Sequence, residues 1–253
     1  MRALAVLLLA GFILLPLVQA VILSFTATQD GGAVGLMNYR AVLADPALRA
    51  AMVNSLIYVS LNVALCIAVA LPAAYALARY RFVGDRHFLL AILVFRVTPP
   101  VVLSLPIFIL FAGLGLVNSP VGIALVHCLF NLPVAIWILE SFIRAVPRAL
   151  DETAFLDGHS GPSFFFRHLI PAIAPGIGVA AFFCFIFSWV EVVFARILTV
   201  TGGKPITMAI QAMFGFQTDI GMVMAMTCLS LVPGVALIWF VRGHLAKGFT
   251  LRA

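Results

Sequence analysis

The stretch from Glu152 to Pro171 carries the residue types most suited to chemistry in this chain. It reads Glu-Thr-Ala-Phe-Leu-Asp-Gly at 152–158 and Phe-Phe-Arg-His-Leu-Ile-Pro at 165–171. Carboxylates at an interface can accept charge-assisted hydrogen bonds from arginine or lysine, which are stronger than neutral ones. Because the rest of the chain is almost entirely apolar, charge kept here indicates a surface in water that meets another molecule.

Turn and capping residues predict two short helices within this stretch. Arg148–Asp157 can form the first helix, and Gly158 would end it because glycine readily adopts the left-handed conformation of a helix end. Ser160 can cap a second helix, which would run over Ser163–Ile170 and end at Pro171. The result is an L-shaped helix pair that could dock on a partner. The alternative is an amphipathic connector lying on lipid.

The first of these helices combines a small apolar face with two carboxylates. Leu150 and Ala154 share one face, Phe155 broadens it, and Glu152 and Asp157 add negative charge. We therefore take these five residues, together with the turn that follows them, as the candidate docking surface.

The composition defines the class of protein. Hydrophobic residues make up 64% of the chain and charged residues only 9%, whereas an ordinary soluble domain is about a quarter charged. A soluble core cannot absorb this much apolar surface, so the chain is predicted to be an all-α membrane protein. A spanning helix needs about 20 mostly apolar residues. Six runs qualify: Ala3–Phe25, Asn54–Ala78, Phe88–Ala112, Pro120–Phe142, Pro171–Leu198 and Ile220–Val241.

The distribution of basic residues predicts the orientation. One side of the membrane would hold Arg2, Arg79, Arg81, Arg86, Arg144, Arg148, Arg167, Arg242, Lys247 and Arg252. The other side would hold Arg40, Arg49 and Lys204, with Arg196 near its boundary. Because loops rich in lysine and arginine stay in the cytoplasm, both termini and the docking stretch are predicted to be cytoplasmic. The net charge of +6 is spread over loops, which excludes a basic face for nucleic acid.

The first apolar run has two interpretations. Arg2, the apolar residues and Val18-Gln19-Ala20 also resemble a secretory signal peptide with a small-residue cleavage site. The run continues to Phe25, which is longer than a usual signal core, so a retained first helix is favoured.

Two charged residues fall within predicted spans. Arg96 lies in the third run and Glu191 in the outer part of the fifth. A charge at membrane depth costs at least about 2.5 kcal/mol and normally faces the bundle interior or a water-filled cavity. The functional interpretation is a translocation path, and the structural alternative is an ion pair or a snorkelling side chain. His127 and the four cysteines are interpreted as packing or hydrogen-bonding residues, and no catalytic or metal site is predicted.

The loop between the fifth and sixth runs, Thr199–Asp219, is unusually apolar for a segment outside the membrane. Ala212, Met213, Phe214 and Gly215 are its candidate contact residues for an external partner or a solute. The alternative is a surface helix packed on neighbouring loops.

The docking stretch resembles the EAA motif of permease subunits of bacterial ABC importers. The family pattern is Glu-Ala-Ala, two further residues, Asp-Gly-Ala, and later Ile-x-Leu-Pro, and it matches here without gaps. Glu152, Asp157, Gly158 and Pro171 keep the charged and turn positions. The departures are Thr153, His159, His168 and Ile170.

Further stretches resemble the carbohydrate-uptake branch of this family, of the type of the smaller permease subunit of maltose importers. They are Asn54-Ser55-Leu56, Ala74 to Arg79, Arg96-Val97-Thr98-Pro99-Pro100, Asn131-Leu132-Pro133 and Ser188-Trp189-Val190-Glu191. The resemblance covers essentially the whole chain and places Asn131 beside Arg96 and Glu191 among candidate path residues.

The resemblance implies a type I ABC importer permease fold in the bacterial inner membrane. It implies a second permease subunit, two ATPase subunits that dock on the EAA-like stretch, and an external solute-binding protein. ATP and magnesium would bind to the ATPase subunits, since this chain has no phosphate-binding G-x-x-x-x-G-K-[ST] loop and needs no cofactor of its own.

The chain is thus read as one transmembrane domain, 1–253, with a core at about 50–242 and a coupling segment at 147–170. The expected function is import of a sugar, polyol or related small polar solute as a non-catalytic subunit. The alternative is a self-sufficient secondary transporter or channel that uses Arg96 and Glu191. The identity of the solute does not follow from the residues.

Overall fold

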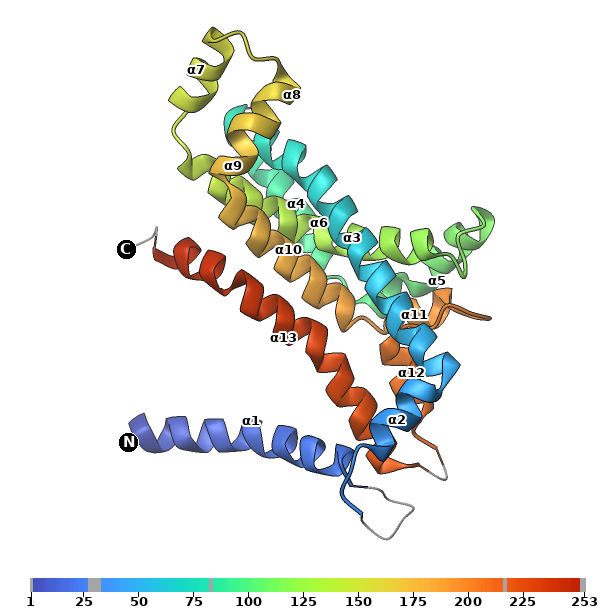
Figure 1. Ribbon diagram of the computed structural model, residues 1–253. Helices are drawn as coiled ribbons and strands as arrows, with labels where there is room; N and C mark the ends of the chain where they lie inside the picture. Colours follow the sequence, from blue (N-terminus) through green and yellow to red (C-terminus); the bar gives the residue numbers. More distant parts are fainter. Residues whose placement is uncertain (1, 27–32, 82–83, 216–217, 251–253) are drawn as a thin grey trace. The chain divides into compact units, whose positions relative to one another are not determined.

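The computed structural model describes residues 2–26, 33–81, 84–215 and 218–250, and this part of the chain is almost entirely helical (Figure 1). Its only β pairing is an isolated antiparallel bridge between Thr26 and Val34. The predicted all-α class is therefore confirmed. The helices are α1 (Arg2–Ser24), α2 (Met37–Ala44), α3 (Pro46–Arg79), α4 (Asp85–Val97), α5 (Pro100–Gly113), α6 (Pro120–Ala145), α7 (Ala149–Leu156), α8 (Gly161–Phe164), the π-helical turn η1 (Phe165–Leu169), α9 (Ile170–Ala172), α10 (Ala174–Trp189), α11 (Val193–Leu198), α12 (Ile206–Ala212) and α13 (Ile220–Thr250).

Three described helices are long and apolar enough to cross a membrane: α3, α6 and the Ile220–Arg242 part of α13. The bent pair Gly161–Ala172 and Ala174–Trp189 would add a fourth crossing, with an angle of 82° between its two parts. Ala10–Ser24 and Pro100–Gly113 are shorter apolar helices. Among the described residues, six unbroken spans are therefore not found, and the six-span topology stays a prediction.

The predicted span Phe88–Ala112 consists of two helices, α4 and α5, that are separated at Thr98 and Pro99. Pro99 has φ −60° and ψ 127°, an extended conformation, and Pro100 starts α5. A residue before proline is pushed out of the helical region, and proline itself offers no N–H to continue a helix. The double proline therefore ends one helix and starts the next, where hydropathy alone indicated continuity.

The predicted span Pro171–Leu198 is also divided, because α10 ends at Trp189 and α11 begins at Val193. Glu191 lies between them and accepts hydrogen bonds from the backbone N–H groups of Phe194 at 2.9 Å and Ala195 at 3.1 Å. The first N–H groups of a helix have no acceptor within the helix. A carboxylate that supplies the acceptors thus favours the start of a new helix at this point.

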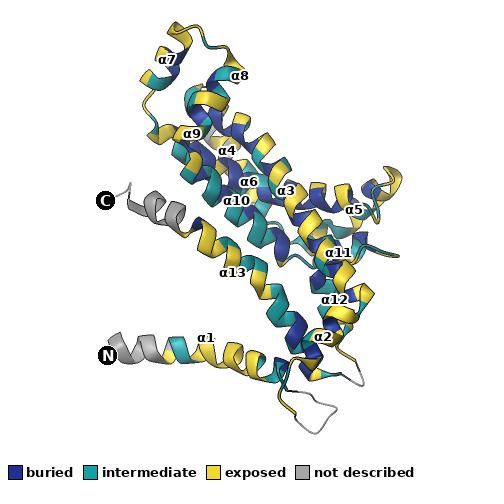
Figure 2. Ribbon diagram, in the orientation of Figure 1, coloured by how far each residue is buried: buried dark blue, intermediate teal, exposed yellow. Residues whose placement is uncertain are grey.

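The chain forms two compact units. Unit 1 contains Met1–Ser55 and Gly203–Ala236, and unit 2 contains Leu56–Gly202 and Leu237–Ala253. The most apolar part of α6 is 67% buried, but that of α13 is only 17% buried. The colouring of Figure 2 shows the same contrast between α6 and α13, and it also shows exposed residues along α1. The exposed apolar faces fit contact with lipid or a partner subunit.

Unit 1 is held together where α1, α2 and α13 come close. Asn38 donates from Nδ2 to the carbonyl oxygens of Ser24 and Thr26, both at 2.9 Å. A Cβ atom on Gly221 would lie 2.5 Å from that Nδ2 and 2.6 Å from the Thr26 oxygen. Only glycine therefore allows the start of α13 to approach this hydrogen-bonded corner.

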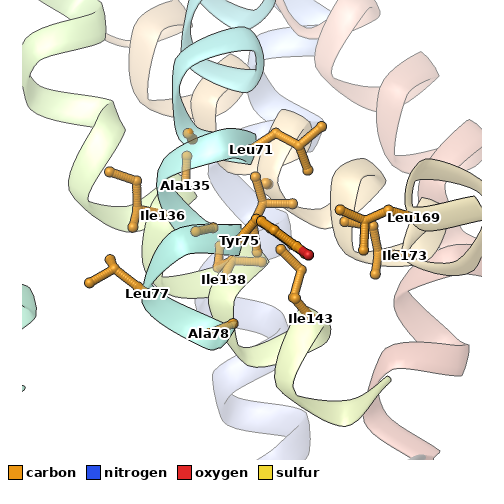
Figure 3. Close-up of a cluster of buried hydrophobic side chains, with 14 of the residues drawn as sticks. Leu71, Tyr75, Leu77, Ala78, Ala135, Ile136, Ile138, Ile143, Leu169 and Ile173 are labelled. Carbon is orange, nitrogen blue, oxygen red and sulfur yellow. The ribbon is translucent and has the colours of Figure 1, made fainter. Parts of the chain in front are cut away.

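Unit 2 is built around α6, which packs against α4 and α10. The C-terminal half of α3 adds Ala70, Ala74 and Ala78, which are all buried and spaced one helical turn apart. Small residues at this spacing let membrane helices approach closely. Figure 3 shows the resulting apolar cluster, in which Leu71 and Tyr75 of α3 lie among side chains of α6 together with Leu169 and Ile173.

The contact between α6 and α10 gives a stability prediction. A Cβ atom on Gly176 would lie 2.5 Å from Cγ of Phe142, so Gly176→Val must push the two helices apart. We expect a loss of about 1–3 kcal/mol, the usual cost of overpacking, seen as a lower midpoint in thermal unfolding of the detergent-solubilised protein. Gly234→Val is the matched control, because nothing lies within 4 Å of its Cβ position. An equal effect of the two substitutions would contradict this packing.

Candidate functional site

The docking stretch folds as two short helical limbs joined at Gly158. The first limb, α7, ends with Gly158 at φ +80°. The N–H of His159 donates to the carbonyl of Ala154 and that of Gly158 to the carbonyl of Phe155, both at 3.1 Å. This pair of bonds is the Schellman arrangement, in which a left-handed residue satisfies the last carbonyls of a helix. The predicted left-handed stop at Gly158 is therefore confirmed.

The second limb differs in detail from its prediction. Ser160 occupies the N-cap position with extended backbone, but its side chain makes no capping hydrogen bond. The limb begins at Gly161, passes through η1 and continues as α9 to Ala172. The predicted end at Pro171 is wrong, because Pro171 lies inside α9. The break follows at Ile173, where φ is −104° and ψ is 13° and the chain bends into α10.

The docking residues divide into an inner and an outer set. Ala154 is buried with Phe164 and Leu169, so Ala154 can act only by holding α7 in place. The exposed residues of the two limbs include the carboxylates and several large apolar groups, with Phe155 at 48% and Leu156 at 87% exposure. Leu150 is half-buried, and the other exposed residues include Glu152, Asp157, Gly158, Phe166, Arg167 and Pro171. A surface that combines exposed carboxylates with exposed aromatic groups is chemically suited to a protein partner.

A residue that sequence reasoning missed fixes this surface to the membrane helices. Asp151, next to Glu152, is buried and binds the guanidinium of Arg79 with both oxygens: Nε to Oδ2 at 2.8 Å and Nη2 to Oδ1 at 3.1 Å. Tyr75 donates its hydroxyl to Oδ2 at 3.0 Å. The sequence shows an acid and a base at these positions, but nothing in it links residues 72 positions apart.

A second polar cluster lies inside unit 2, where Glu191 caps α11. His127 Nε2 lies 3.3 Å from Oε2 of Glu191, and His127 Nδ1 lies 2.5 Å from Oγ of Ser188. Sequence reasoning found no serine–histidine–acid arrangement, yet these three residues meet. His127 is 5% and Ser188 4% exposed, whereas a catalytic nucleophile must reach a substrate. The arrangement serves to connect α6 to the end of α10.

The three residues assigned to a translocation path line one cavity of ≈ 40 Å³. Arg96 places its guanidinium carbon 4.6 Å from the ring centre of Phe187. Asn131 donates from Nδ2 to Oδ1 of Asn62 at 3.0 Å. A cavity needs about 10–15 Å³ per water, so this one accommodates a few waters or one functional group of a solute. Arg96, Asn131 and Glu191 are thus brought together, as the path hypothesis requires.

The apolar loop is anchored in unit 1 at its first turn. Asn54 donates from Nδ2 to the carbonyl of Lys204 at 3.3 Å, and Ser55 Oγ accepts from the N–H of Ile206 at 2.7 Å. From this anchor α12 runs to the predicted contact residues. Ala212 and Gly215 are exposed, Met213 is half-buried, and Phe214 is 60% exposed. Aromatic residues are enriched in contact surfaces between proteins, so an exposed phenylalanine fits the predicted contact role.

The comparison with known protein families identifies the chain. A family model described as binding-protein-dependent transport system inner membrane component matches residues 67–248. The chain belongs to this family. The resemblance to permease subunits of ABC importers is thereby confirmed.

Relatives of this permease carry names of sugar transport. It is 28% identical over 254 residues to the trehalose transport system permease protein SugB of Mycobacterium tuberculosis, with 96% of this chain and 93% of that protein covered. It is 30% identical over 223 residues to the trehalose/maltose transport system permease protein MalG of Thermococcus litoralis, with 86% and 80% covered. A solved bacterial ABC transporter that imports the acidic polysaccharide alginate shares the fold, with TM-score 0.80, 19% identity and coverage of 96% and 94%.

Proposed function

We propose that this permease is the transmembrane subunit of an ATP-driven importer for a sugar, polyol or related small polar solute. The observation that carries the proposal is the docking stretch, because exposed Glu152 and Asp157 stand on a short helix that is fixed by buried contacts. Family membership supplies the reaction class. The names of the relatives, which include trehalose, maltose and diacetylchitobiose permeases, support the solute class.

The proposed topology has six crossings, with α4–α5 and α9–α11 each counted as one broken crossing. The limbs of the docking stretch and the ends of α3 and α6 carry Arg79, Arg144, Arg148 and Arg167. This concentration of positive charge supports a cytoplasmic location for the docking stretch and for both termini. The family description, which names an inner membrane component, supports a location in the bacterial inner membrane.

The proposed assembly contains a second permease subunit, two ATPase subunits and an external solute-binding protein. ATP and magnesium would act on the ATPase subunits, and this chain would carry no catalytic group of its own. Exposed Phe155, Leu156 and the two carboxylates would contact the ATPase.

Co-expression and uptake test the proposed function. The permease should co-purify with an ATPase subunit and, in proteoliposomes with ATP, take up one member of a panel of trehalose, maltose and N,N′-diacetylchitobiose presented with the binding protein. Uptake by this chain alone, without an ATPase, would instead support a self-sufficient transporter that uses Arg96 and Glu191.

Two substitutions in the docking stretch should uncouple the importer. Glu152→Lys reverses a charge at the interface, and Gly158→Val forces a β-branched residue to φ +80°, where L-residues lose about 1–2 kcal/mol. Both variants should insert in the membrane but lose ATPase binding or stimulated ATP hydrolysis. Glu152→Ala should be milder because the apolar contacts remain.

The control for the glycine variant is Gly161→Ala, because its Cβ position is open and its φ is not positive. Assembly and hydrolysis are measured by co-purification and by phosphate release in reconstituted complexes. Wild-type assembly, hydrolysis and uptake in both severe variants would reduce this stretch to a membrane-surface connector.

The loop after α11 is proposed to contact the binding protein or the solute. A photo-cross-linker at exposed Ala212 or Gly215 should capture the binding protein during turnover, because the apolar side chain of Phe214 offers a contact beside them. The products are resolved by mass spectrometry. The same cross-linker at exposed Phe166, on the docking stretch, is the control and should capture no binding protein. A loop that stays uncaptured throughout turnover would have another role.

The cavity lined by Arg96, Asn131 and Glu191 is proposed as part of the translocation path. Arg96→Gln should lower uptake at least about tenfold, with ATPase assembly unchanged, because charged groups within membrane proteins mark solute pathways. Arg196→Gln is the control, since Arg196 is exposed and does not line this cavity. Near-normal uptake by the Arg96 variant would identify Arg96 as a snorkelling or packing residue.

A further inference from the structure

The two limbs of the docking stretch are attached to the membrane helices in different ways. The second limb, α8 to α9, continues into α10 through the bend at Ile173. The first limb, α7, is held instead by side chains at the cytoplasmic end of α3, through the buried pair of Asp151 and Arg79. The attachment of α7 is therefore a lateral contact between side chains, not a continuous helix.

Three arginines extend this attachment to the backbone. Arg79 also donates from Nη2 to the carbonyl of Val146 at 3.1 Å. Arg148 donates to the carbonyl of Arg79 at 3.4 Å, and Arg144 donates to that of Leu77 at 3.2 Å. The last carbonyls of a helix lack partners within it. Here the last carbonyls of α3 accept hydrogen bonds from Arg144 and Arg148, at the junction of α6 and α7. In return, Arg79 of α3 donates to a carbonyl of that junction.

The geometry of the pair fixes direction as well as distance. A guanidinium that binds both oxygens of one carboxylate forms two parallel hydrogen bonds, which add geometric specificity to the attraction. Tyr75, one turn before Arg79, adds a third donor from the same helix. With exposed fractions of 7% for the Arg79 side chain and 11% for that of Asp151, little water can screen the pair.

We propose that Asp151 is a positioning residue that makes α7 and the cytoplasmic end of α3 move as one body. This proposal rests on the proposed function, because the motion comes from an ATPase subunit docked on α7. Force on α7 then reaches α3 through the Asp151–Arg79 pair, and it reaches the second limb through the contact of Phe155 with Phe164, whose ring centres lie 5.2 Å apart. One docking stretch thus transmits motion both to α3 and, through the second limb, to α10.

Distances between spin labels test whether α7 and α3 move together. Exposed Ala76 on α3 and exposed Ala149 on α7 are replaced by cysteine, and half-buried Cys228 by serine. In the assembled complex the Ala76–Ala149 distance distribution should stay the same in the nucleotide-free, ATP-bound and vanadate-trapped states. A second pair, Ala149 and exposed Ala172 on the second limb, is the reference for motion within the docking stretch itself.

Two variants separate positioning from simple packing. Asp151→Asn keeps the shape but removes the charge, and should broaden the Ala76–Ala149 distribution and lower stimulated hydrolysis about tenfold. Arg79→Met with Asp151→Leu removes both charges, a change that often restores stability to a buried pair. The double variant should recover the thermal midpoint but not the narrow distance distribution or the hydrolysis. Arg81→Gln, which removes a charge at an exposed site near Arg79, is the control.

The outcomes are distinct. A double variant with wild-type distances and hydrolysis would overturn the proposal, since apolar packing would then suffice. An Ala76–Ala149 distance that changes during the wild-type cycle would also overturn it, as would unchanged distances in Asp151→Asn. Failure of the proposed function would be seen in co-purification, before any distance is measured, because the wild-type permease would then bind no ATPase subunit.

Discussion

The buried ion pair between Arg79 and Asp151 is the interaction on which the docking surface depends. Removing one partner of such a pair leaves an uncompensated charge and costs about 3–5 kcal/mol, whereas an exposed pair contributes about 0–1 kcal/mol. The carboxylate of Asp151 is satisfied by three donors, all from α3. Its neighbour Glu152 is exposed. Two adjacent acids therefore have opposite tasks, one facing inward to hold the helix and the other facing outward to water.

The need to satisfy buried polar groups also explains where the membrane helices break. An apolar chain has few polar groups to satisfy a free helix end, and both interruptions in unit 2 occur where a local solution exists. At Pro99 and Pro100 the missing donor of proline removes one such demand. At Glu191 a carboxylate accepts from two free N–H groups, and His127 lies within hydrogen-bonding distance of the same carboxylate. Polar residues thus gather at the breaks, and the cavity that holds Arg96 lies beside them.

Features that depend on a few neighbouring residues could be predicted from the sequence. The left-handed stop at Gly158 and the N-cap position of Ser160 follow from local backbone preferences, and the long apolar runs predict α3, α6 and α13. The end of the second limb was assigned to the wrong proline, since Pro171 is accommodated within α9, whereas Pro175 lies in the first turn of α10 and cannot donate to the preceding turn, so the break falls at Ile173. Hydropathy windows average over the double proline and conceal the break between α4 and α5.

Contacts between distant positions were beyond sequence reasoning for a physical reason. Arg79 and Asp151 are one base and one acid among several, and only the packing of α3 against the docking stretch selects this pairing. The same holds for Ser188 with His127, since both lie in apolar runs that hydropathy treats as featureless. In each case the two polar partners lie on different helices. Their contact depends on how the helices pack, so the sequence of neither helix alone reveals it.

Two departures from the EAA pattern acquire a meaning only in three dimensions. His159 and His168 stand where the family pattern has small or apolar residues, and their rings are in edge-to-face contact with centres 4.6 Å apart. His159 Nδ1 also lies 2.9 Å from Oγ of Ser163, which ties the turn to the start of the second limb. Both histidines are half-buried between the limbs, whereas Glu152 and Asp157 are exposed. The altered positions therefore adjust the joint between the limbs and leave the charged outer surface as the family pattern has it.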